Sequence, residues 1–341
     1  MRLTLTRPDD WHLHLRDGAA LQTTVPDTAR SFARAIVMPN LKPPVASVAA
    51  AADYRQRILA AVPNELQFEP LMTLYLTPDL SPSTIREAAQ TDFIHGVKLY
   101  PKGATTNSDA GVSSLDAMMP TLEAMADCAM PLLVHGEVTE REIDIFDREA
   151  VFIETILAPL MARLPTLRVV LEHITTKDSV DYVRANPQMG ATITAHHLMF
   201  DRNDMLAGGI RPHLYCLPIL KRSRHRDALV QAATSGLPQF FLGTDSAPHA
   251  IGDKESDCGC AGCYTAPHAL ELYAEVFDAA GQMDRLEGFA SQFGPAFYRL
   301  PVNTETITLE KKPTQLPLSR PFGDSEVRLL RGGETLSWSI A

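Results

Sequence analysis

The sequence has no long apolar run and no basic stretch. Its N-terminus, MRLTLTRPDD, contains no apolar signal core, and no segment of the 341-residue chain approaches the roughly 18 apolar residues that a membrane helix needs. The net charge is −10 without a compensating run of Lys and Arg, which argues against a binder of nucleic acid or of anionic membranes. We therefore expect a cytoplasmic protein whose partners are small molecules, with no nucleic acid and no membrane among them.

Cysteines are few and unevenly placed. There are five, and three of them lie in Cys258-Gly-Cys260-Ala-Gly-Cys263. A disulfide framework is not expected in the cytoplasm. A structural zinc site would need a fourth ligand at suitable spacing, and Cys128 and Cys216 are distant in sequence. Free thiols in a Gly-rich loop are the favoured interpretation, with a zinc site as the alternative.

The chain also lacks internal repeats, low-complexity linkers and an evident Gly-rich phosphate turn. With 45% hydrophobic and 21% charged residues, it is long enough to bury a large core, either as one (β/α) barrel or as two ordinary domains. Short apolar segments predict strands at residues 10–17, 35–40, 68–76, 96–100, 130–135, 168–173, 191–197 and 239–245. Helical patterns are found at residues 19–34, 45–61, 114–128, 140–164, 223–234, 267–280 and 284–292, and in a helix from Pro82 capped by Ser81.

Eight strand–helix alternations without a boundary predict an α/β fold, a (β/α)8 TIM-type barrel. We expect residues 1–341 to form a single domain, with the tail from about residue 301 as a short appendage. A doubly wound open sheet is the alternative, but it would need a topological switch and a Gly-rich phosphate turn.

The most distinctive stretch is DWHLHLRD, residues 10–17. Side chains alternate in an extended strand, so His12, His14 and Arg16 share one face, and the apolar residues between them can pack against a helix. Two imidazoles and a guanidinium suit metal cations and an anionic substrate better than a hydrophobic core. A surface strand with two incidental histidines explains an isolated pair equally well, and a salt bridge to Asp10 or Asp17 is the ordinary role for Arg16.

Other predicted strands also end on polar residues. Alternation pairs each of them with an apolar or small residue on the same face: Asn40 with Met38, Lys98 with Gly96, His135 with Leu133, His173 with Leu171 and Asp245 with Gly243. In a barrel, the ends of these strands would surround one mouth. Taken singly, each has an ordinary explanation as a hydrogen-bonded core histidine, a lysine that reaches solvent or a helix-capping aspartate. Lys102 is a rival of Lys98, and His196 and His197 are rival ligands on the seventh strand.

Several motifs together resemble the amidohydrolase superfamily and, within it, the dihydroorotase family of the shorter bacterial type (class II), over nearly the whole chain. The residues that carry the resemblance are DWHLHLRDG (10–18), MPN (38–40), VKLYP (97–101), ATTN (104–107), LVHG (133–136), LEHI (171–174), GTDSAPH (243–249) and CGCAGC (258–263).

This resemblance implies two zinc ions in each chain. One ion would be held by His12, His14 and Asp245, and the other by His135 and His173, with Lys98 bridging them as an N-carboxylated lysine. The carbamate explains the lysine, because an ammonium cannot bind a cation whereas a carbamate offers two anionic oxygens. The matched motif selects Lys98 over Lys102, and the family pattern does not use His196 or His197 as ligands.

The resemblance also implies a reaction, the reversible hydrolysis of (S)-dihydroorotate to N-carbamoyl-L-aspartate in pyrimidine biosynthesis. Asp245 would be both ligand and proton shuttle. The implied substrate-binding residues are Arg16, Asn40 and His249 for the carboxylate, main-chain groups at Leu217 and Ala261 for the ring, and Thr105 and Thr106 in a polar loop that closes over the site. A homodimer is implied as well.

Two alternative functions are open at this point. Hydantoinases and dihydropyrimidinases of the same superfamily act on rings without the carboxylate, and Arg16 together with Asn40 argues against them. A non-catalytic scaffold need not keep a complete ligand set, so the intact group of histidines, lysine and aspartate argues against this second alternative.

Overall fold

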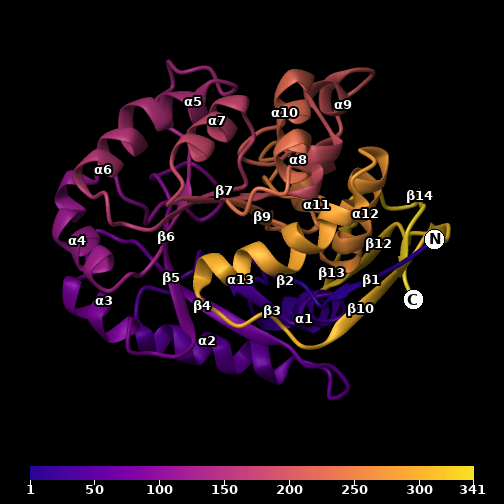
Figure 1. Cartoon of the computed structure of the whole chain (residues 1–341), viewed down its shortest axis with the longest axis horizontal. Helices are drawn as coiled ribbons and strands as arrows, with labels where there is room; N and C mark the ends of the chain where they lie inside the picture. Colours follow the sequence, from indigo (N-terminus) through magenta and orange to yellow (C-terminus); the bar gives the residue numbers. More distant parts are fainter.

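Eight parallel strands form one sheet that curves into a nearly closed barrel in the computed structural model, which describes residues 1–341 (Figure 1). The strands are neighbours in the order in which they occur in the sequence: β2 (Asp9–Leu13), β3 (Arg34–Val37), β4 (Glu69–Tyr75), β5 (Ile94–Leu99), β6 (Leu132–His135), β7 (Val169–Glu172), β8 (Gly190–Ile193) and β9 (Phe240–Leu242). A doubly wound sheet would reverse this order at a switch point, so that alternative is excluded. The predicted (β/α)8 barrel is confirmed.

Helices connect the strands and cover the outside of the barrel (Figure 1). They are α1 (Leu21–Ala29), α2 (Val48–Ala60), α3 (Pro82–Ala88), α4 (Met119–Asp127), α5 (Arg148–Phe152), α6 (Ala158–Arg163), α7 (Lys177–Ala185), α8 (Ala195–Met199), α9 (Arg202–Leu206), α10 (Ser223–Ala233), α11 (Ile251–Lys254), α12 (Ala269–Ala279) and α13 (Phe293–Tyr298). As predicted, Ser81 caps α3, because its hydroxyl accepts a hydrogen bond from the Thr84 N–H. None of the helices has the length and apolar character that crossing a membrane requires.

Apolar side chains fill the amino-terminal part of the barrel interior. The residues of this cluster are Trp11, Ile36, Met38, Leu71, Leu133, Val170, Phe241 and Tyr298. Tyr298 of α13 stacks on the Trp11 indole with ring centroids 4.5 Å apart. Gly294 lets α13 approach this closely, because a Cβ at that position would lie 1.9 Å from Trp11 Nε1. The polar ends of the strands are therefore left at the opposite, carboxyl end of the barrel.

The first and last barrel strands are joined through Asp10. Its carboxylate accepts hydrogen bonds from Thr244 N (2.8 Å), Thr244 Oγ1 (2.6 Å) and His12 N (3.1 Å). Next to this contact, Asp245 N donates to the His12 carbonyl at 2.8 Å. Burial raises the pKa of Asp10 to about 7, although the hydrogen bonds from Thr244 oppose the shift. This junction holds His12 of β2 next to Asp245, which follows β9.

The two ends of the chain pair with each other outside the barrel. β1 (Arg2–Thr6) lies antiparallel to β10 (Thr306–Glu310), which also pairs with β15 (Ser339–Ile340). The rest of the tail forms two small antiparallel pairs, β11 (Thr314–Gln315) with β14 (Thr335–Leu336) and β12 (Ser319–Phe322) with β13 (Ser325–Arg328). The residues after 301 thus contain strands that the sequence analysis did not predict.

Some predicted elements need correction. The first strand ends at Leu13 instead of residue 17, and its register shifts between Asp10 and Leu13. Trp11 lies in the interior cluster and packs against α13, whereas Leu13 and Leu15 lie in the outer core. The helical region predicted at 140–164 begins at Arg148. The predicted strand 191–197 is wrong in its second half, because the Thr194 hydroxyl accepts a hydrogen bond from the backbone N–H of His197 and starts α8.

Replacement of Gly294 by Ala tests the close packing of α13. We expect Gly294→Ala to lower the free energy of unfolding by about 1–3 kcal/mol, because the new methyl group overlaps the buried Trp11 indole. Urea denaturation measures the change. Gly252→Ala is the matched control, since nothing lies within 4 Å of a Cβ there. Equal stability of the two variants would contradict the packing described.

Candidate active site

The six predicted metal ligands are gathered at the carboxyl end of the barrel. His12 Nε2 and His14 Nε2 lie 3.3 Å and 3.2 Å from the same oxygen, Asp245 Oδ1. The His173 ring centroid is 4.9 Å from the centroid of His12 and 4.9 Å from that of His135. Lys98 is completely buried between these strands. Side chains from five barrel strands or the residues just after them therefore converge, as the sequence predicted.

His173 reaches the site by a route that strand alternation did not predict. Val170 and Glu172 of β7 face the barrel interior, whereas Leu171 packs in the outer core against the helices. The expectation that His173 shares a face with Leu171 is therefore wrong. Its φ of +42° is unusual for a residue other than glycine and turns the side chain back into the barrel mouth. Asp245 has a similar φ of +43°.

Glu172 is the central residue that the sequence analysis missed. Its Oε1 lies 2.9 Å from His12 Nδ1, and its Oε2 accepts a hydrogen bond from Lys98 Nζ. Glu137 has a similar place beside His135, with 2.9 Å between Glu137 Oε2 and His135 Nε2. Glu172 lies in the LEHI motif and Glu137 follows the LVHG motif, but the alternation that placed Leu171 and His173 inward put Glu172 on the outer face. Carboxylates that contact ligand histidines in this way fix the orientation of the rings.

The electrostatics of the group follow from burial and close pairing. Burial disfavours the charged form of His12, but the Glu172 and Asp245 carboxylates outweigh it and raise the pKa of His12 to about 9. Burial also acts against the Asp245 carboxylate, yet hydrogen bonds with His12 and His14 hold its pKa well below the usual range. Burial lowers the pKa of Lys98, with Glu172 opposing the shift. The site thus combines anionic carboxylates with a lysine that is easier to deprotonate than usual.

The residues present fit a divalent metal centre. The ligand atoms of His12, His14 and Asp245 all lie within 4.8 Å of one another, and so do those of His12, Glu172 and His173. His173 Nδ1 is buried without a hydrogen-bond partner. A buried polar atom without a partner is costly, and coordination to a cation would satisfy it.

The predicted substrate-binding residues surround the same small cavity. It is lined by Arg16, Asn40, Thr105, Thr106, Leu217 and Ala261 together with His14, Tyr100, His135, His173, Asp245, Ala247 and Gly262. His249 lies behind this lining, with its Nε2 atom 3.0 Å from Arg16 Nη2 and 3.0 Å from the Ala261 carbonyl. Tyr100, which was not predicted, has a buried hydroxyl without a hydrogen-bond partner.

Arg16 has no carboxylate partner. Asp17 accepts two hydrogen bonds from Arg57 instead, and Asp10 is engaged by Thr244. The Arg16 Nε donates to the Pro248 carbonyl at 3.0 Å. The ordinary role considered for Arg16, a salt bridge within its own strand, is therefore excluded, and its positive charge is available to an anionic ligand.

The polar loop after β5 closes the cavity. Asn40 Nδ2 donates to the Thr106 carbonyl at 3.0 Å, and Asn107 Nδ2 donates back to the Asn40 carbonyl at 3.0 Å. Asn40 also contacts the metal-ligand group, because its Oδ1 lies 2.9 Å from His14 Nδ1. The enclosed space is about 20 Å³, room for about one water molecule. A larger ligand therefore needs part of this lining to move, and the loop that carries Thr105 and Thr106 belongs to it.

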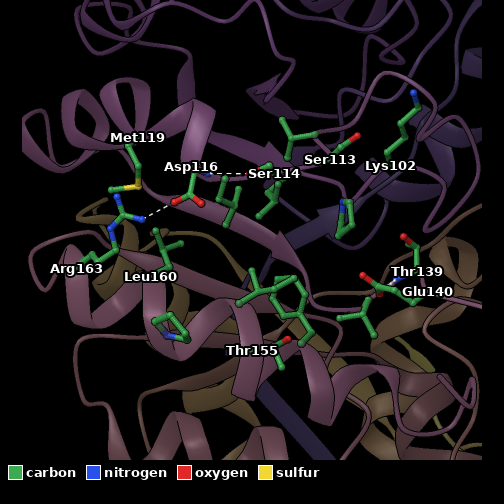
Figure 2. Close-up of a pocket in the computed structure, with 18 residues that line it drawn as sticks. Lys102, Ser113, Ser114, Asp116, Met119, Thr139, Glu140, Thr155, Leu160 and Arg163 are labelled. Carbon is green, nitrogen blue, oxygen red and sulfur yellow. Dashed lines mark hydrogen bonds and ion pairs between the residues drawn. The ribbon is translucent and has the colours of Figure 1, made fainter. Parts of the chain in front are cut away.

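A larger cavity of about 640 Å³ lies outside the barrel, beside the base of this loop and the helices α4 to α6 (Figure 2). Arg163 and Asp116 form an ion pair in its wall, with 2.6 Å between Nη1 and Oδ1. None of the predicted site residues lines it. Lys102, the rival of Lys98, lines this outer cavity and is exposed, so it does not compete for a place among the histidines.

The structure also corrects the argument about the cysteines. Cys216 is distant from Cys263 in sequence, but the two sulfur atoms and the His196 ring lie within 4.8 Å of one another, all buried. His197 Nε2 lies 3.6 Å from Cys216 Sγ, but it also contacts the Pro218 carbonyl at 2.9 Å and is not among the ligand atoms that lie within 4.8 Å of one another. Only three ligands converge here, one fewer than in structural zinc sites, and the ammonium of Lys254 opposes a cation. Free thiols are consistent with this arrangement.

Comparison with known proteins shows close relatives over the full length. Residues 9–313 match the model of the amidohydrolase family. The dihydroorotase of Cupriavidus taiwanensis is 66% identical over 338 residues, which cover 99% of this chain and 98% of that protein. The chain belongs to the dihydroorotase family of amidohydrolases. Its predicted class, a cyclic amide hydrolase, is confirmed.

Solved structures of dihydroorotases share the fold as well. The dihydroorotase of Campylobacter jejuni has a TM-score of 0.92 at 38% identity, covering 99% of this chain and 97% of that chain. The dihydroorotase of Saccharomyces cerevisiae, solved in complex with 5-fluoroorotic acid, has a TM-score of 0.92 at 34% identity, covering 100% of this chain and 98% of that chain. With relatives this similar over their whole lengths, the non-catalytic scaffold is no longer a competing interpretation.

The importance of Glu172 can be tested through metal affinity. We expect Glu172→Gln to weaken metal binding about 10- to 100-fold, because the neutral amide no longer matches His12 Nδ1 and Lys98 Nζ. Competition with a chelator, followed by metal analysis, measures the change. Glu271→Gln is the matched control, since Glu271 is a buried carboxylate paired with Arg30 outside the site. Equal metal affinity in both variants would contradict this role of Glu172.

Proposed function

We propose that this enzyme catalyses the reversible hydrolysis of (S)-dihydroorotate to N-carbamoyl-L-aspartate, a step of pyrimidine biosynthesis, in the cytoplasm. The observation that carries the proposal is the meeting of two groups in one small cavity: Arg16 without a carboxylate partner, and the buried side chains of His14, His135, His173 and Asp245. Arg16 suits a substrate that carries a carboxylate, and the buried group suits amide hydrolysis.

The cofactor we propose is a pair of zinc ions. His12, His14 and Asp245 would hold one ion, and His135 and His173 would hold the other. Lys98 would join the two as an N-carboxylated side chain. Zinc, when bound, supplies Lewis acidity that activates water and polarises the ring carbonyl.

Carboxylation of Lys98 needs a neutral amine. Burial lowers the pKa of Lys98, which favours this form. The amine nitrogen then attacks carbon dioxide, a C–N bond forms and one proton is released. The remaining N–H of the carbamate still has an acceptor in Glu172, whose Oε2 accepts from Lys98 Nζ in this structure. Glu172 therefore supports both forms of the side chain.

Asp245 is the proposed proton shuttle. The Asp245 carboxylate is ionised, which a proton acceptor requires, and we propose that it takes a proton from the attacking water. It would then donate this proton to the leaving ring nitrogen, and the same transfers in reverse would serve cyclisation. Its position after β9, anchored to β2 through the His12 carbonyl, keeps it at the centre of the cavity.

Substrate recognition is assigned to the cavity lining. Arg16, Asn40 and His249 would bind the carboxylate, and main-chain groups at Leu217 and Ala261 would hold the ring. Thr105 and Thr106 would lie against the substrate on closure of the loop and exclude water. Rings without a carboxylate leave Arg16 unpaired, which favours dihydroorotate over the substrates of hydantoinases and dihydropyrimidinases.

The domain organisation and the oligomeric state are also proposals. We propose that residues 1–341 act as one domain, with the residues after 301 as its appendage, and that two copies form a homodimer. Family resemblance supports the dimer.

Removal and return of metal tests the reaction and the cofactor together. We expect the purified protein to hydrolyse dihydroorotate, to lose this activity with a chelator and to recover it with zinc, at about two ions per chain. Loss of ring absorbance follows the reaction. Two bound ions without turnover would redirect the proposal to another cyclic amide, and activity that survives complete metal removal would reject the zinc centre.

Replacement of Arg16 tests the carboxylate-binding role. We expect Arg16→Ala to lower kcat/KM for dihydroorotate about 10- to 100-fold, the loss of a hydrogen bond between charged groups. Arg57→Ala, which removes the exposed guanidinium that pairs with Asp17, is the control and should keep the wild-type value. Full activity of Arg16→Ala would refute the assignment.

A further inference from the structure

Lys254, which the proposed mechanism does not use, is a buried cation beside the substrate cavity. It is the last residue of α11 and only 3% exposed. Its ammonium donates three hydrogen bonds to main-chain carbonyls: to Tyr215 at 2.7 Å, to Cys260 at 2.8 Å and to Gly262 at 2.9 Å. A lysine has three donors, so this ammonium is fully satisfied without any carboxylate. All three hydrogen bonds can form only when the Tyr215, Cys260 and Gly262 carbonyls point at the same ammonium.

The three carbonyls belong to two loops that are distant in sequence. Tyr215 is two residues before Leu217, whereas Ala261 lies between Cys260 and Gly262. Leu217, Ala261 and Gly262 line the substrate cavity. The loops are also joined by a hydrogen bond from Gly262 N to the Tyr215 carbonyl at 3.0 Å. Lys254 therefore holds together the two main-chain segments that flank one side of the cavity.

The ring contacts assigned to these loops are made by main chain, so their geometry depends on the backbone alone. Gly262 has a φ of +153°, and a Cβ there would lie 2.5 Å from the Ala247 carbonyl, which shows how closely this loop is packed. The Ala261 carbonyl itself lies 3.0 Å from His249 Nε2. A small shift of either loop would move Leu217, Ala261 and His249 relative to one another.

We propose that Lys254 is a positioning residue that clamps the loops at 215–217 and 260–262 and thereby sets the affinity for the substrate ring. This inference rests on the proposed function, because it takes dihydroorotate as the ligand of these loops. Lys254 does not contact the reacting atoms, so it governs binding rather than the chemical step. Pre-ordered loops lower the cost of ordering them when the ligand binds.

The first test compares Lys254→Met and Lys254→Arg with the wild type. We expect Lys254→Met to raise KM for dihydroorotate at least about 10-fold with kcat within about 3-fold, because the lost contacts act on binding. The Kd for 5-fluoroorotic acid, measured by calorimetry, should rise by a similar factor. Lys254→Arg keeps a cation with several hydrogen-bond donors. Its KM and Kd should therefore lie closer to the wild-type values than to those of Lys254→Met, on a logarithmic scale. Metal content should not change.

A matched control separates positioning from general loosening. Arg34 is a buried cation at the amino end of β3, paired with Asp9 at 2.6 Å. Arg34→Met should lower the melting temperature without raising KM. An unchanged KM in Lys254→Met, a fall in kcat alone, or an equal rise of KM in Arg34→Met would overturn the proposal.

Hydrogen exchange on the wild-type protein decides the case in which Lys254→Met does not fold. The backbone N–H groups of residues 215–219 other than Pro218, and those of residues 258–263, should lose protection in one common step, because Lys254 holds both loops. Separate opening of the two segments, with protection differing more than about 10-fold, would overturn the clamp. A wild-type protein without turnover of dihydroorotate would reject the proposed function, and the exchange experiment would still decide the clamp.

Discussion

The pairing of buried charges at the carboxyl end of the barrel is the constraint on which the site depends. Glu172 and Asp245 are almost completely buried, and an unpaired buried carboxylate costs several kcal/mol. Each is therefore matched by cationic or hydrogen-bonding neighbours, Glu172 by His12 and Lys98, and Asp245 by His12 and His14. Because His12 serves both carboxylates, the positions of the whole group are linked.

The barrel holds this group in place from two directions. Below it, the apolar cluster around Trp11 excludes water from the amino-terminal half of the interior. At its side, Asp10 and Thr244 join β2 to β9, which fixes the distance between His12 and Asp245. Substrate entry is then left to the loop that carries Thr106 and Asn107, which two hydrogen bonds join to Asn40. The apolar cluster thus fixes the positions of the charged residues, and the loop controls access to them.

Much of this arrangement was accessible from the sequence. Short apolar segments indicated all eight barrel strands. Alternation correctly placed Lys98 and His135 on the inner face, because both residues lie within regular strands, β5 and β6. Alternation failed for His173, because a left-handed φ lies outside the geometry of a strand. It failed for His196 because a helix cap at Thr194 ended the strand early. Lys254 left no sequence signal, since its partners are main-chain carbonyls, which every residue possesses.

The pairing of the chain ends has a consequence for the order of folding. Thr4 and Thr308 are in hydrogen-bond contact at 2.8 Å, although 304 positions separate them in sequence. Closing so long a loop is entropically unfavourable in a disordered chain, and the cost falls once intervening structure has brought the ends together. Contacts between barrel strands that follow each other in sequence span far shorter loops. We therefore expect the terminal sheet to form late in folding, on a barrel that has already formed, and to contribute little to the nucleus.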